Sequence, residues 1–176
     1  MLFEETDLKG VFLIKPEIFT DQRGFFARSF CRREFEAHGL DPRVVQCSIS
    51  FNIKKSTLRG MHFQRPPHAE IRLVRCTRGA VYDVVLDLRA GSPTFRRWVA
   101  TELSDENRLA IYVPEGFAHG FQTLEAETEV FYQISEFHNQ TAAAGVRWDD
   151  TAFGIEWPKA NRTISAKDLS YPDFAW

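Results

Sequence analysis

The sequence has no long apolar run, few cysteines and no excess of positive charge. No hydrophobic stretch approaches the ~20 residues that a membrane-spanning helix needs, so no membrane partner is expected. The first ten residues, MLFEETDLKG, lack a basic segment followed by an apolar one, so no secretory signal is expected. The net charge is −2, which gives no global basic field to draw the chain to nucleic acid.

Cysteines are scarce and unsuitably spaced. Cys31, Cys47 and Cys76 are an odd number, and no two of them form a CxxC pair. This spacing argues against a disulfide framework or a zinc knuckle and favours reduced thiols. Together with the missing signal, it predicts a cytoplasmic protein.

The strongest pattern is a succession of short strand-like segments. The 176 residues are 44% hydrophobic, enough for one domain over residues 1–176 with a sizeable core. Beyond GVFLIKP and the turn TDQRGFF near the start, the predicted strands lie at 44–53, 57–64, 71–77, 79–89, 94–103, 108–114, 119–124 and 128–137. This succession predicts an all-β jelly-roll barrel or sandwich. One convincing helix begins after Ser29, its predicted N-cap, and ends at Gly39.

Alternation within Val81–Leu88 is unusual. It puts Asp83 and Asp87 on the same strand face as Val81 and Val85. Two acids on such a face are costly to bury, so this face is predicted to line a polar cavity.

Candidate chemistry is concentrated in Leu58–Gly79 and in the later segment VPEGFAHGF. The first holds Arg59, His62, Glu70 and Arg72, and the second adds His119 after a proline-glycine turn. Histidines beside arginines favour proton chemistry on an anionic substrate, because imidazole titrates near neutrality. The alternatives are core histidines bound to backbone groups and a Glu70–Arg72 pair that only neutralises itself.

Three further side chains have simple structural interpretations. Gln64 shares strand parity with His62 and is expected to point the same way. Tyr132 shares a strand face with Val130 and Ile134, which predicts a core residue. Asp168, in the segment TISAKD, is predicted to be a helix cap or a surface aspartate.

In order along nearly the whole chain, the segments resemble the dTDP-4-dehydrorhamnose 3,5-epimerase family, a branch of the cupins. The resemblance is carried by FTDQRGFF, VVQCSISFN, LRGMHFQ, IRLVRCTRGAVYDVVLDLR, GSPTFRRW, YVPEGFAHGFQTL, EVFYQISEF and ISAKD. It implies a cupin jelly roll with one or two short peripheral helices. It also implies a homodimeric isomerase, without metal or other cofactor, acting on a nucleotide-diphosphate-linked 4-keto-6-deoxyhexose.

The resemblance also implies roles for single residues. His62 matches the general base, Asp168 the carboxylate that orients it, and Tyr132 the acid on the other face of the sugar ring. Arg72 stands where the family places a lysine beside the developing enolate. The matching substrate-binding positions are Arg23, Phe26, Gln46, Ser48, Arg59, His119, His138 and Lys167.

Several positions depart from the family pattern. His138 replaces a common tyrosine that stacks on the base, Ser48 an asparagine, and Glu70 a glutamine, while Arg28 and Ala143 replace glutamates. The nucleotide base, the sugar and the number of inverted centres are therefore left open. A C3-only epimerase or a ketoisomerase of another deoxysugar pathway is the alternative within the same chemistry.

Two other classes compete with the epimerase. His62, Glu70 and His119 occupy three of the four ligand positions of metal-dependent cupins, and a two-histidine, one-carboxylate site would suit iron. Arg59 and Arg72 oppose this, because they would add positive charge beside a dication. A sugar-nucleotide-binding protein without catalysis is the third class.

Overall fold

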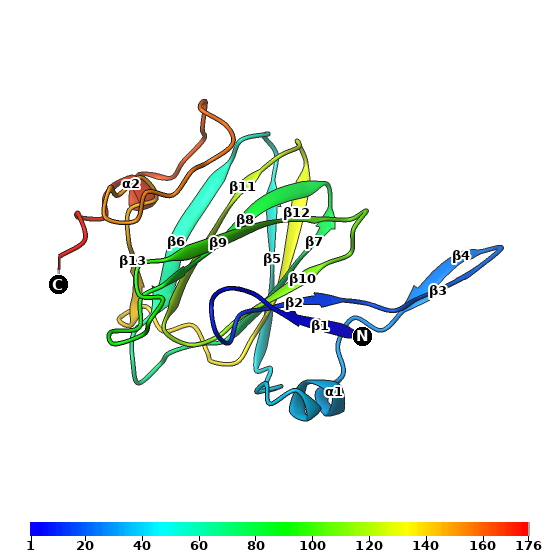
Figure 1. The fold of residues 1–176 in the computed structure, drawn as a ribbon. Helices are drawn as coiled ribbons and strands as arrows, with labels where there is room; N and C mark the ends of the chain where they lie inside the picture. The colour runs from blue at the N-terminus through cyan, green and yellow to red at the C-terminus, as the bar shows by residue number, and fades with distance from the viewer. Residues whose placement is uncertain (176) are drawn as a thin grey trace.

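A computed structural model describes residues 1–175, which form two stacked antiparallel sheets, a projecting hairpin and two short helices (Figure 1). The predicted all-β sandwich is confirmed. The first sheet has the order β1-β2-β10-β7-β12-β5. Its strands are β1 (Leu2–Glu5), β2 (Phe12–Lys15), β10 (Ala110–Val113), β7 (Arg72–Arg78), β12 (Thr128–Ile134) and β5 (Gln46–Asn52).

The second sheet has five strands in the order β13-β6-β11-β8-β9. They are β13 (Ala143–Gly145), β6 (Leu58–Gln64), β11 (Phe117–Thr123), β8 (Ala80–Asp87) and β9 (Trp98–Ser104). No helix in the part of the chain that the structure describes is long and apolar enough to cross a membrane.

The hydrophobic core forms three layers around these sheets. Between the sheets, Val74, Val85 and Phe121 belong to a cluster of fully buried side chains. On the outer face of the five-stranded sheet, the other side of β8 packs beneath the C-terminal segment. Because both faces of β8 are covered, the strand is apolar almost throughout.

The outer face of the six-stranded sheet is covered by α1 (Arg32–Ala37), whose Phe35 is buried. The predicted start of this helix is wrong, because the N-cap is Cys31 and it makes no side-chain cap bond. Ser29 lies outside the helix, and its carbonyl accepts a hydrogen bond from Arg75. The predicted end is confirmed: Gly39 has a φ of +71° and its N–H donates to the carbonyl of Glu36.

The two acids of β8 do not share a polar cavity, so that prediction is wrong. Asp87, at the end of the strand, accepts hydrogen bonds from Arg89, Ser92 and Thr94 in the following loop. Asp83 lies inside the sandwich and pairs with His119. Each carboxylate is fully buried because it has its own partners.

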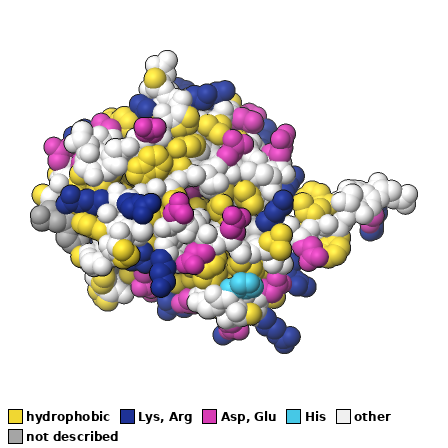
Figure 2. Space-filling view, viewed as in Figure 1, with side chains coloured by type: hydrophobic (Ala, Val, Ile, Leu, Met, Phe, Trp, Pro, Cys, Tyr) yellow, Lys and Arg dark blue, Asp and Glu magenta, His cyan; other side chains and the backbone are white. Residues whose placement is uncertain are grey.

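A two-stranded hairpin, β3 (Ile18–Asp21) and β4 (Gly24–Ala27), pairs with neither sheet and projects from the body (Figures 1 and 2). Phe19, Phe25 and Phe26 on it are all more than half exposed. A lone hairpin is marginal in water, and such exposed aromatic side chains mark surfaces that contact something else.

Candidate active site

A cavity of about 350 Å³ opens between the two sheets. Strands β5, β7 and β12 form one wall, while β6 and β11 form the other. The lining residues are Gln46, Ser48, Ser50, Arg59, His62, Glu70, Arg72, His119, Gly120, Phe121, Tyr132, Ile134 and His138.

On one wall, His62 is held by a carboxylate from the C-terminal segment. Asp168 lies on α2 (Ala166–Leu169), a single turn capped by the Ser165 hydroxyl, which accepts from the Asp168 N–H. One Asp168 oxygen lies 2.6 Å from His62 Nε2, and the other accepts from the Gly60 N–H at 3.3 Å. Asp168 is thus a buried partner of the histidine and not a surface residue.

Burial would raise the pKa of Asp168, but hydrogen bonds with His62, Gly60 and Ser165 outweigh it and hold the pKa below its ordinary value. The carboxylate is therefore charged at neutral pH. A charged Asp168 therefore holds Nε2 of the His62 imidazole and fixes the orientation of the ring.

The pairing of β6 with β11 is irregular where it passes the site. The register shifts between His119 and Phe121, and Gly60 has a φ of +132°. A Cβ at Gly60 would lie 2.6 Å from the Cα of Gly120, so the two strands can approach this closely only with glycine here.

Tyr132 stands on the opposite wall, on β12. Burial and the nearby charge of Asp83 raise the pKa of its hydroxyl, against the smaller opposing effects of Arg72 and Arg59. The phenol is therefore protonated at neutral pH and has a proton to give. Tyr132 packs against the core, as its strand face predicted, and also lines the cavity.

His119 is 3% exposed and faces Asp83 at the bottom of the cavity. Its Nε2 lies 2.8 and 3.0 Å from the two Asp83 oxygens. The His119 ring meets the Tyr132 ring edge-on, with centroids 6.1 Å apart. The partner of His119 is thus a buried carboxylate and not a backbone group.

Arg59 is exposed at the cavity mouth. Its Nε donates to the buried Asn52 Oδ1 at 2.7 Å, and Asn52 Nδ2 donates to the Thr128 carbonyl. Asn52 therefore fixes the direction of an exposed guanidinium that remains open to an anion.

Asn52 and Ser50 were missed in the sequence, although β5 carries the signal. Every second residue of this strand is polar, starting with Gln46 and Ser48, which were predicted as substrate-binding residues. These polar residues are Gln46, Ser48, Ser50 and Asn52. Continuing that alternation from Ser48 by two further steps would have identified Ser50 and Asn52.

Arg72 and Glu70 pair with each other, the arrangement that the sequence left open, and both line the cavity. Arg72 also donates to the carbonyl of His62 at 3.0 Å. The pair is therefore part of the site and not only an isolated ion pair.

Some predicted site residues lie outside this cavity. Arg23 and Phe26 are on the projecting hairpin, where Arg23 pairs with Asp21. Lys167 is exposed on α2. His138 does line the cavity, and its N–H donates to Gln46 Oε1.

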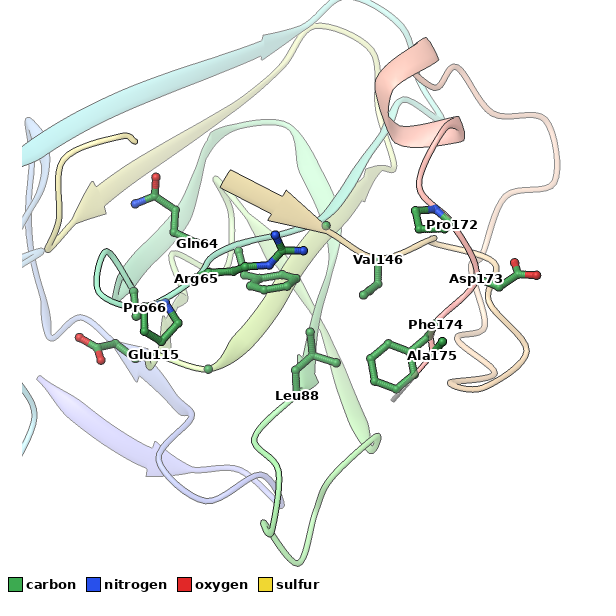
Figure 3. A pocket seen from close by; sticks show the side chains of 14 residues that line it. Gln64, Arg65, Pro66, Leu88, Glu115, Val146, Pro172, Asp173, Phe174 and Ala175 are labelled. Atoms are coloured by element: carbon green, nitrogen blue, oxygen red, sulfur yellow. The ribbon is translucent and has the colours of Figure 1, made fainter. Parts of the chain in front are cut away.

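Gln64 lies on the same strand face as His62, since Phe63 between them packs on the opposite face, but it is not among the described residues that line this cavity. Its amide donates to the His68 and Phe137 carbonyls and accepts from the Asn139 N–H. It lines a separate hollow of about 960 Å³ beside the C-terminal segment, where Val146 and Phe174 lie (Figure 3). None of the predicted site residues is among the described residues that line this hollow.

The ligand set of a metal-dependent cupin is not assembled. Within residues 1–175 no three His, Cys, Asp or Glu side chains converge to hold a metal ion. His62, Glu70 and His119 are each engaged by another side chain: Asp168, Arg72 and Asp83 respectively.

Comparison with known proteins identifies the family. The family model described as dTDP-4-dehydrorhamnose 3,5-epimerase matches residues 5–175. The dTDP-4-dehydrorhamnose 3,5-epimerase of Sinorhizobium fredii is 44% identical over 173 residues, covering 98% of this chain and 89% of the relative.

Solved structures agree with the sequence comparison. The dTDP-4-dehydrorhamnose 3,5-epimerase of Bacillus anthracis, with TDP and PPi bound, superposes with a TM-score of 0.96 at 38% identity, covering 98% of this chain and 99% of that one. The dTDP-6-deoxy-D-glucose-3,5-epimerase of Legionella pneumophila, in complex with dTDP-4-keto-L-rhamnose, gives 0.91 at 34% identity, covering 97% and 90%. The chain has their cupin-type fold, belongs to the dTDP-4-dehydrorhamnose 3,5-epimerase family and is an isomerase.

Proposed function

We propose that this enzyme inverts C3, C5 or both centres of a dTDP-linked 4-keto-6-deoxyhexose, as in dTDP-L-rhamnose biosynthesis. One observation carries the proposal: His62, tied to buried Asp168, and protonated Tyr132 stand on opposite walls of one cavity. Inversion of a carbon requires removal of a proton from one face of the ring and its return to the other. We place the reaction in the cytoplasm, which suits three unpaired cysteines.

The proton transfers follow from the acidity of a ketone. The C4 carbonyl acidifies the hydrogens on C3 and C5, because removal of either gives an enolate with its charge on the C4 oxygen. His62 takes the proton, and the guanidinium of Arg72 stabilises the oxyanion. Tyr132 then protonates the same carbon from the other face, and its raised pKa keeps that proton in place until the enolate forms.

Binding of the diphosphate is assigned to arginines. Arg59, aimed by Asn52, lies at the cavity mouth, while Arg23 of the same chain lies on the projecting hairpin. We infer that Arg23 and Phe26 serve the cavity of a second copy, giving a homodimer with two composite sites. The relative solved with TDP and PPi bound supports a phosphate-binding function for this fold.

The outer face of β5 supports the same dimer. Its polar side chains face the cavity, so Ile49 and Phe51 point outward and are 64% and 46% exposed on an edge strand. Exposed apolar residues on a sheet edge mark a contact surface, and the aromatic hairpin of a second copy would pack on them with apolar side chains of its own.

Solvent isotope exchange tests the function. Incubation with dTDP-4-keto-6-deoxyglucose in heavy water is expected to place deuterium at C3 and C5, and at C3 alone for a C3-only epimerase. His62→Ala is expected to lower the rate by roughly 10²–10⁴-fold, the range of general-base catalysis. Tight binding of the sugar nucleotide without deuterium uptake would refute the proposal and leave a binding protein. Loss of stoichiometric iron, zinc or manganese together with activity would instead establish the metal-dependent class.

A further inference from the structure

Glu70 and Arg72 form a charge pair inside the wall of the cavity. Their side chains are 7% and 14% exposed. Arg72 Nε donates to Glu70 Oε1 at 2.9 Å, and Nη2 donates to the same oxygen. Arg72 Nη1 donates to the backbone carbonyl of His62 at 3.0 Å. Three of the five N–H groups of the guanidinium therefore bind partners within the described residues, and the other two are available to the cavity.

These three bonds define where the remaining two N–H groups point. A guanidinium is planar, so bonds from Nε and Nη2 to Glu70 and from Nη1 to His62 fix its plane and its rotation. A lysine ammonium at the same position would pivot on a flexible stem. The wall thus presents a cation with a set direction and not only a positive charge.

We propose, on the basis of the function assigned above, that Glu70 is a positioning residue that aims the two free N–H groups of Arg72 at the C4 oxygen of the substrate. Two effects oppose each other here. The negative charge of Glu70 weakens the field of Arg72, while its hydrogen bonds fix the guanidinium where the enolate forms. Alignment dominates, because preorganised donors stabilise an oxyanion without reorganising during the reaction.

The proposal makes positions 70 and 72 a coupled unit. With Glu70 present, a lysine at position 72 is drawn to the carboxylate and away from the substrate. With glutamine at position 70, the same ammonium is released toward the cavity. A merely structural ion pair would show no such rescue of the catalytic rate.

Four variants test this: Glu70→Gln, Glu70→Asp, Arg72→Lys and the double variant Glu70→Gln/Arg72→Lys. Deuterium uptake and epimerisation are measured with thermal unfolding as a folding check. We expect each single variant to lower kcat by about tenfold, since a charge-assisted bond or its geometry is lost, with KM little changed. The double variant is expected to recover to within about threefold of wild type. Glu36→Gln, in the exposed Arg32–Glu36 pair, is the matched control and is expected to leave kcat unchanged.

Wild-type kcat in Glu70→Gln or Glu70→Asp would overturn the role of Glu70, and so would a double variant no faster than Arg72→Lys. If Glu70→Gln fails to fold, Glu70→Asp tests the role of Glu70, because aspartate keeps the negative charge but its side chain is one methylene shorter. Absence of deuterium uptake by the wild-type enzyme would instead refute the proposed function itself. Failure of the function and failure of this inference are thus distinguished by the wild-type measurement.

Discussion

Asp87 provides a stability prediction whose size follows from its surroundings. Burial would raise the pKa of this carboxyl, but hydrogen bonds from Arg89, Ser92 and Thr94 outweigh burial and lower the pKa from 3.8 to about 2. A carboxyl with a depressed pKa in the folded state stabilises the fold above its unfolded pKa. That stability is lost as the pH falls through the folded pKa. A difference of about two pKa units corresponds to about 2–3 kcal/mol at neutral pH, and roughly half of this stabilisation is lost by about pH 3.

The perturbation is Asp87→Asn, which keeps the shape and removes the charge. In urea unfolding at neutral pH, the variant is expected to have a free energy of unfolding lower than that of wild type by about 2 kcal/mol or more. Near pH 3 this difference in unfolding free energy is expected to be smaller by about 1 kcal/mol. Asp149→Asn removes an ion pair with Arg147 whose side chains are about one-third exposed, and it is the control, with an expected effect below about 1 kcal/mol. An equal difference in unfolding free energy at both pH values would refute the reasoning, because the charge of Asp87 would then contribute nothing to stability.

Three further predictions concern the site. Asp168→Asn is expected to lower kcat by roughly 100-fold with little change in KM, since His62 loses its charged partner; steady-state rates within twofold of wild type would contradict this. Mixing inactive Arg23→Ala and His62→Ala enzymes is expected to restore part of the activity, because one composite site of a mixed dimer is intact; a mixture that stays inactive would argue against shared sites. If the imidazole of His138 relaxes base recognition, kcat/KM for CDP- and GDP-linked substrates is expected to approach that for dTDP, and a strong dTDP preference would contradict it.

Much of the sandwich was predictable from the sequence because antiparallel strands joined by short turns carry local signals. The predicted segment 128–137 contains β12, and 57–64 contains β6. The helix start was not predictable in the same way. Phe30 packs on Phe35 with ring centroids 4.9 Å apart, so the chain stays extended through Cys31 and passes the better capping residue, Ser29.

The site was predictable by resemblance and much less by pattern. Nothing local marks Asp168 as the partner of His62, since 106 positions separate them. The pairing of Asp83 with His119 depends on β8 and β11 being neighbours, which the order of strands along the chain does not state. Strand parity places Gln64 on the face of His62, but it does not reveal that a loop backbone binds its amide.

That separation of Asp168 from His62 has a consequence for biosynthesis. Every strand of both sheets precedes α2 in the chain, since the last of them, β13, ends at Gly145. N-terminal parts of a chain fold first during synthesis, so the sandwich can close around a histidine that still lacks its carboxylate. A nascent chain, or one cut by a protease between β13 and α2, would therefore hold a complete cavity wall and an untethered His62. On the mechanism proposed above, α2 supplies the carboxylate that orients His62, so closure of the sandwich can precede assembly of the His62–Asp168 pair.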